Sequence, residues 1–139
     1  MEVWDAYNKE FEKIEGMTLI RGEAIPDGFY HLVSDIIVKH VDGTYLLMQR
    51  DIRKNFGGMW EATAGGSALK GEGALACAIR ELREETGIES EALTEVGRVV
   101  NDHTIQFTLN SSVLQTVRKN ELPFRKAKHQ RSSGWQKTS

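Results

Sequence analysis

The sequence predicts an α+β fold in which a mixed β-sheet is flanked by helices. Three observations predict this fold. Runs of β-branched and apolar residues bounded by turn residues occur in both halves of the chain, and one short amphipathic helix ending at Gly87 lies between them. The chain has 139 residues, which is enough for one domain with a core of its own.

The N-terminal segment, residues 1–29, has a periodicity that leaves two structures open. Its apolar residues at helical spacing are Trp4, Tyr7, Phe11 and Ile14. The stretches Val3 to Tyr7 and Met17 to Arg21 would equally suit the two strands of a hairpin. In either structure we expect Trp4 and Tyr7 to pack in the core.

Two strands and a turn are predicted next. The turn Pro26 to Gly28 precedes the β-branched run from His31 to His40, which is typical of a buried strand. Asp42-Gly43 then predicts a hairpin that pairs this run with Thr44 to Arg50.

A loop and three further strands complete the predicted sheet. The loop, residues 51–59, carries Arg53, Lys54 and Asn55, which we expect to be solvated rather than to bind phosphate. The predicted strands are Trp60 to Thr63, Leu93 to Val100 and Thr104 to Leu109.

The helix between these strands has two predicted faces. Its expected core side is formed by Leu75, Ala78, Ile79 and Leu82. Glu81, Glu84 and Glu85 fall within roughly a 100° arc on another side, where three like charges repel one another. A solvated acidic face is one interpretation, and a site for Mg²⁺ or Mn²⁺ is the other, because hard cations prefer carboxylate oxygens.

The motif around this helix resembles the signature of the Nudix hydrolases. Its fixed positions are Gly66, Glu72, Arg80, Glu81, Leu82, Glu84, Glu85, Gly87 and Ile88, and all of them match. The segments WDAY and RGEAIPDGFYHLV also resemble the Nudix subgroup that is similar to isopentenyl diphosphate isomerase. This resemblance favours an extended N-terminal segment and implies a Nudix α/β/α sandwich.

The resemblance implies metal-dependent hydrolysis of a diphosphate linkage in a nucleoside diphosphate derivative, with Mg²⁺ as cofactor and Mn²⁺ as an alternative. Glu84 and Glu85 would be the principal ligands, the Gly65 carbonyl a further ligand, and Glu81 either a ligand or the general base. Arg80 would orient Glu84 or its neighbour. The loop-supporting residues would be Gly66 and Glu72; no substrate-binding residue is identified.

Other functions remain as alternatives. A catalytically weakened or inactive nucleotide-binding module with the same fold is one. Isopentenyl diphosphate isomerase is less favoured, because the segment WEATAGG lacks the cysteine that those enzymes carry there. Cys77 is expected to pack under the loop rather than to act as a nucleophile.

Charge divides the chain unevenly. Residues 1–100 hold 11 Lys and Arg against 18 Asp and Glu, a net charge of −7, whereas residues 101–139 hold 7 against 2, a net charge of +5. We therefore predict a Nudix domain over residues 1–118 and a basic, disordered or atypical tail over 119–139, with no closing helix and an incomplete C-terminal part.

Composition bears on partners and location. A total net charge of −2 argues against nucleic acid as a bulk partner, and no apolar run approaches the length of a membrane span. The single cysteine, Cys77, excludes an internal disulfide and suits a reducing compartment. We expect a cytoplasmic protein that binds a small molecule, and a homodimer is left open.

Overall fold

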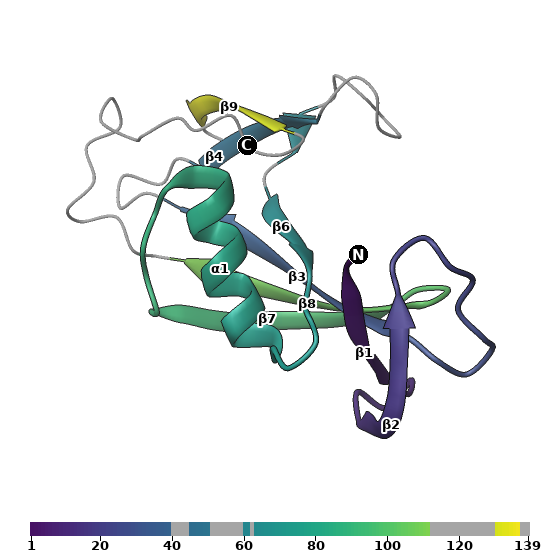
Figure 1. The fold of residues 1–139 in the computed structure, drawn as a ribbon. Helices are drawn as coiled ribbons and strands as arrows, with labels where there is room; N and C mark the ends of the chain where they lie inside the picture. The colour runs from purple at the N-terminus through teal and green to yellow at the C-terminus, as the bar shows by residue number, and fades with distance from the viewer. Residues whose placement is uncertain (40–44, 51–59, 62, 112–129, 137–139) are drawn as a thin grey trace.

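The computed structural model describes residues 1–39, 45–50, 60, 61, 63–111 and 130–136, and the side chains of 1–39 and 64–111. One helix, α1 (Ala74–Thr86), lies across a sheet in this part of the chain (Figure 1). This arrangement confirms the predicted α+β class with a mixed sheet. Among the described residues, no helix is long and apolar enough to cross a membrane.

The central sheet has four strands in the order β6-β3-β8-β7. Their bounds are Thr63–Ser67 for β6, His31–Val38 for β3, Thr104–Ser111 for β8 and Leu93–Val100 for β7. Strand β3 pairs antiparallel with β6 and parallel with β8, while β7 pairs antiparallel with β8. Burial alternates along β3 and β8, so every second side chain faces the helix.

The core lies between this sheet and α1. Its fully buried members include Leu32 and Ile36 from β3, Ile105 from β8, and Leu82 from the helix. The helix ends at Gly87, whose φ of 78° is left-handed, as the sequence predicts.

The predicted core side of the helix is wrong at Leu75, which is 48% exposed. The buried face is centred on Ala78 and Glu85, which lie almost on one line along the helix. Leu75 lies about 60° round the axis from Ala78, in the first turn. In angle Leu75 lies between Leu82 and Thr86, which are both buried, so its exposure follows from its place in the first turn. Part of the acidic stripe, Glu81 and Glu85, is buried with the core side.

The N-terminal segment is a hairpin of β1 (Val3–Tyr7) and β2 (Lys13–Ile20), which confirms the extended alternative. Trp4 is buried, as predicted, and its indole stacks on the His31 ring with centroids 4.1 Å apart. Tyr7 is partly buried and packs against the main core. The hairpin is thereby attached to the start of β3.

The third sheet has the order β5-β4-β9 and corrects one prediction. Its bounds are Trp60–Glu61 for β5, Tyr45–Arg50 for β4 and Gln130–Gln136 for β9. Strand β4 pairs with β5 and β9, so the predicted β3–β4 hairpin pairing is wrong, because β6 and β8 occupy both edges of β3. Strand β9 lies within residues 119–139, the segment predicted to be a disordered or atypical tail, and pairs there with β4. The boundary at residue 118 and the atypical character of this segment stay predictions.

Candidate functional site

Two adjacent glycines bring β6 against its neighbours more closely than any side chain would allow. A Cβ at Gly65 would lie 2.1 Å from the backbone oxygen of Ser34, and one at Gly66 would lie 2.7 Å from Oε1 of Glu81. Both separations are shorter than van der Waals contact permits. The absence of side chains therefore lets the strand pass directly beside the Glu81 carboxylate.

Arg80 is the centre of a polar network that joins α1 to the glycine loop before it, residues 68–73. Its guanidinium donates to Glu72 at 2.7 and 2.9 Å, to Glu81 Oε1 at 2.8 Å and to Glu84 Oε2 at 3.1 Å. A further bond of 3.0 Å reaches the Ser67 carbonyl oxygen. The hydrogen bonds with Glu72 and Glu81 hold the pKa of Arg80 above its usual value despite partial burial. Arg80 is a fixed cation among three carboxylates.

Glu72 joins the glycine loop to the helix. Its Oε1 accepts a hydrogen bond of 2.8 Å from the Leu69 backbone N–H, and both carboxylate oxygens accept from Arg80. The hydrogen bond from Arg80 is the main cause that lowers the pKa of Glu72, while desolvation opposes it. Glu72 is therefore ionised near neutral pH and clamps the loop through Arg80.

The three carboxylates of the acidic stripe lie in different environments. Glu81 and Glu85 are buried, at 6% and 8% exposure, whereas the Glu84 side chain is 33% exposed. The structure thus excludes a uniformly solvated acidic face. It brings Glu81, Glu84 and Glu72 together around Arg80.

The donor atoms of this site suit a divalent cation, but the side chains are not arranged around one in this structure. Carboxylates beside a strand backbone are the donor set that Mg²⁺ and Mn²⁺ prefer. In the part of the chain that the structure describes, no three His, Cys, Asp or Glu side chains lie together as a metal site. Glu81 and Glu84 are hydrogen-bonded to Arg80 instead. Gly65 immediately precedes Gly66, so its backbone borders the same region.

Cys77 lies against β6, fully buried, with Sγ 3.4 Å from the Gly66 carbonyl oxygen. Burial raises the pKa of this thiol to about 12. A neutral, enclosed thiol is a poor nucleophile. Its position agrees with the expected packing role.

Sequence reasoning missed two residues that attach the motif to the sheet and to the hairpin. Ser34, fully buried on β3, donates a hydrogen bond of 2.8 Å to the Ala74 carbonyl oxygen at the start of the helix. A signal for it exists: Ser34 is the one polar residue among the buried positions of an apolar strand. Asp5 on β1 accepts a bond of 2.8 Å from the Gly71 N–H, and no local pattern indicates it. The cationic loop of Arg53, Lys54 and Asn55 lies outside the described residues.

The family model described as NUDIX domain matches residues 29–129 of this chain. An uncharacterized Nudix hydrolase from Listeria monocytogenes is 40% identical over 89 residues, which cover 63% of this chain and 52% of the relative. Another from Rhodococcus erythropolis is 35% identical over 79 residues, or 52% of this chain and 43% of the relative. The chain thus spans about half the length of these curated relatives.

Solved structures share the fold. A Deinococcus radiodurans protein matches with a TM-score of 0.73 and 18% identity, over 98% of this chain and 83% of its own. A MutT structure, from work on Aliivibrio salmonicida and Vibrio cholerae, matches with a TM-score of 0.64 and 23% identity, over 78% and 80%. At these identities the likeness concerns the fold alone.

Proposed function

The chain belongs to the NUDIX domain family, and we propose that it hydrolyses a diphosphate linkage in a nucleoside diphosphate derivative, using a divalent cation. The observation that carries this proposal is the Arg80 network, which fixes Glu81 and Glu84 beside the closely packed Gly66. Glu72 joins the loop before the helix to this network, because it accepts hydrogen bonds from the Leu69 N–H and from Arg80.

We assign Glu84 and Glu85 as the principal cation ligands, with the Gly65 carbonyl as a further ligand. Glu81 is either another ligand or the general base that takes a proton from the attacking water. The cation, Mg²⁺ or alternatively Mn²⁺, would neutralise the diphosphate and polarise its phosphorus. Arg80 donates hydrogen bonds to the Glu81 and Glu84 carboxylates and limits their rotation.

Isomerase activity is not assigned, although the N-terminal segment resembles the isomerase-like subgroup. Residues 60–66 contain no cysteine. Cys77 is buried, and burial raises its pKa to about 12, so it does not take the place of the cysteine that residues 60–66 lack. Its free thiol suits the reducing cytoplasm, where we place the protein.

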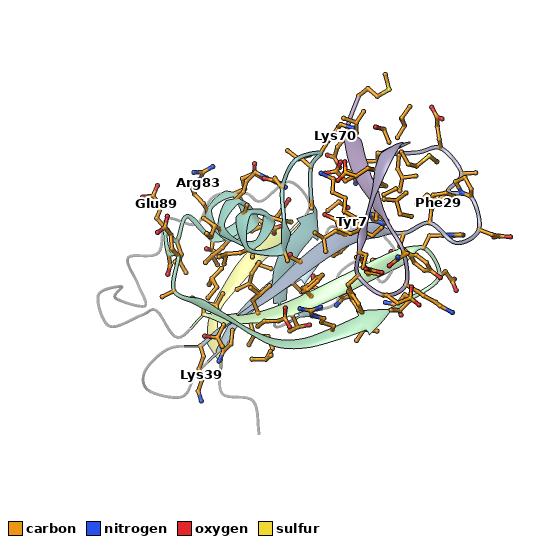
Figure 2. The ribbon with its side chains drawn as sticks, turned by 90° about the horizontal axis from the view of Figure 1, so that it is seen from below. Tyr7, Phe29, Lys39, Lys70, Arg83 and Glu89 are labelled. Atoms are coloured by element: carbon orange, nitrogen blue, oxygen red, sulfur yellow. The ribbon has the colours of Figure 1, made fainter. Side chains whose placement is uncertain are left out.

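The test is an assay of phosphate-containing products from a panel of nucleoside diphosphate derivatives, with and without Mg²⁺. We expect Mg²⁺-dependent turnover that Glu84→Gln lowers on the order of 100-fold, because a cation's charge stabilisation is worth several kcal/mol. Glu89→Gln is the matched control, since Glu89 is an exposed acid just beyond the helix (Figure 2).

The outcomes separate the candidate functions. Equal turnover by the wild type and Glu84→Gln refutes the assignment of the site. Binding of a nucleotide without turnover, under every metal condition, favours a non-hydrolysing binding module with the same fold.

A further inference from the structure

We propose that Asp5, on the N-terminal hairpin, is a positioning residue for the helix carboxylates and acts on them through the glycine loop, residues 68–73. This inference rests on the proposed function, because it concerns how the chain prepares its cation site. Asp5 lies outside the motif and 66 residues before the loop residue that it contacts.

Asp5 is held in one place by burial, by one hydrogen bond and by two nearby ammonium groups. It is 6% exposed, and its Oδ2 accepts the Gly71 N–H at 2.8 Å. The ammonium groups of Lys13 and Lys70 lie 3.5 and 4.0 Å from its carboxylate, with side chains 43% and 51% exposed. Both ammonium groups are at or beyond the limit of hydrogen-bond distance and belong to half-exposed side chains, so the hydrogen bond to Gly71 is the interaction that fixes the position.

Both strands of the hairpin also bind the loop at Lys70, the residue before Gly71. The Lys70 N–H donates to the Val3 carbonyl oxygen at 3.0 Å, and Lys70 Nζ donates to Thr18 Oγ1 at 2.6 Å. Lys70 lies beside the β1–β2 hairpin (Figure 2). The loop is therefore attached to the hairpin at two consecutive residues, Lys70 and Gly71.

The attachment point immediately precedes the clamp on the helix. Gly71 has a φ of 89°, a left-handed conformation that glycine adopts without strain. The next residue, Glu72, bonds Leu69 and Arg80, and Arg80 bonds Glu81 and Glu84. Asp5 is thus connected to Glu81 and Glu84 by the hydrogen bond to Gly71, the peptide bond to Glu72 and the hydrogen bonds of Arg80. The position of Gly71 therefore sets where Glu72 meets Arg80.

The experiment compares Asp5→Ala, which removes the acceptor, with Asp5→Asn, which keeps an oxygen able to accept from Gly71. Glu15→Gln is the control, since Glu15 is an exposed acid on the same hairpin. For each full-length variant, NMR hydrogen exchange follows the Gly71 amide, paramagnetic resonance measures the Kd for Mn²⁺ alone, and thermal unfolding reports the folded fraction.

We expect Asp5→Ala to lose protection of the Gly71 amide and to raise the Mn²⁺ Kd roughly tenfold, as loss of an outer partner of a metal site does. Asp5→Asn should retain the protection and stay within about threefold of the wild-type Kd. Glu15→Gln should match the wild type. A general loss of stability would not explain Gly71 protection and Mn²⁺ affinity that are lost in Asp5→Ala but kept in Asp5→Asn.

An unchanged Mn²⁺ Kd in folded Asp5→Ala, with Gly71 protection lost, overturns the proposal. If Asp5→Ala does not fold, Asp5→Leu serves as the same test with the buried volume kept, and failure of both to fold also overturns it. Should Glu84→Gln abolish Mn²⁺ binding while Asp5→Ala does not alter it, only this inference fails. Should Asp5 control Mn²⁺ affinity in a protein that hydrolyses none of the nucleotides, only the proposed hydrolysis fails.

Discussion

Replacing Gly66 by alanine should displace a carboxylate without disrupting the fold. The added Cβ would lie 2.7 and 3.0 Å from the two carboxylate oxygens of Glu81 and 2.8 Å from Cδ. All three atoms are at the free end of a side chain, so they are able to shift. To reach an ordinary separation of 3.4 Å, the nearest oxygen must move about 0.7 Å.

The expected loss of stability is small. The shift disturbs the 2.8 Å hydrogen bond from Arg80 to Glu81, and a bond to a charged group is worth roughly 1.5–3 kcal/mol. Arg80 keeps its two bonds to Glu72, and replacing glycine by alanine at an accessible φ returns about 0.4–1 kcal/mol. We therefore expect the free energy of unfolding to fall by about 1 kcal/mol and the Tm by roughly 3–5 °C.

The expected loss of activity is much larger, on the order of 100-fold in kcat, because a misplacement near 1 Å can cost that much. Thermal unfolding and steady-state kinetics on the same preparation measure both quantities. Gly73→Ala is the matched control, since a Cβ at Gly73 meets nothing within 4 Å and its φ is −88°. If the kcat of Gly66→Ala is within a few-fold of that of Gly73→Ala, the close packing of β6 against the Glu81 carboxylate is not needed for activity, and the prediction is refuted.

Two further predictions concern titratable groups at the site. The pKa of Glu72 is lowered below its usual 4.5 by Arg80, so its ionised form stabilises the fold above that pH and the stabilisation is lost as pH falls through the lowered pKa. The difference in urea-unfolding free energy between wild type and Glu72→Gln should therefore be full at neutral pH and shrink below about pH 4.5; a difference independent of pH would contradict this. Cys77, with a pKa of about 12 and full burial, should react with iodoacetamide at pH 8 far more slowly in the folded protein than in urea. Equal rates would show that the thiol is accessible.

Local chemistry made part of this fold predictable. The cap at Gly87 and the strands β3 and β8 depend on residues close together in sequence. Periodicity left the structure of the N-terminal segment open, and the family resemblance favoured the extended form that the β1–β2 hairpin has. The residues that meet around Arg80 were also named from their spacing, although Glu72 as its doubly bonded partner was not.

The incorrect predictions depend on long-range packing. The turn signal at residues 42–43 favoured pairing of adjacent strands, but β3 pairs instead with β8, about 70 residues later. Periodicity assigned the faces of α1 without showing that Leu75 is exposed in the first turn or that Glu81 and Glu85 are buried against the neighbouring elements. The bond between Asp5 and Gly71 likewise joins segments that no local pattern connects.

Anomalous diffraction from crystals of the protein soaked in Mn²⁺ would show directly whether the helix carboxylates hold a cation. We expect a peak enclosed by the Glu81, Glu84 and Glu85 carboxylates and bordered by the Gly65 carbonyl. A peak located elsewhere, or no peak with Glu81 and Glu84 still bonded to Arg80, would contradict this expectation.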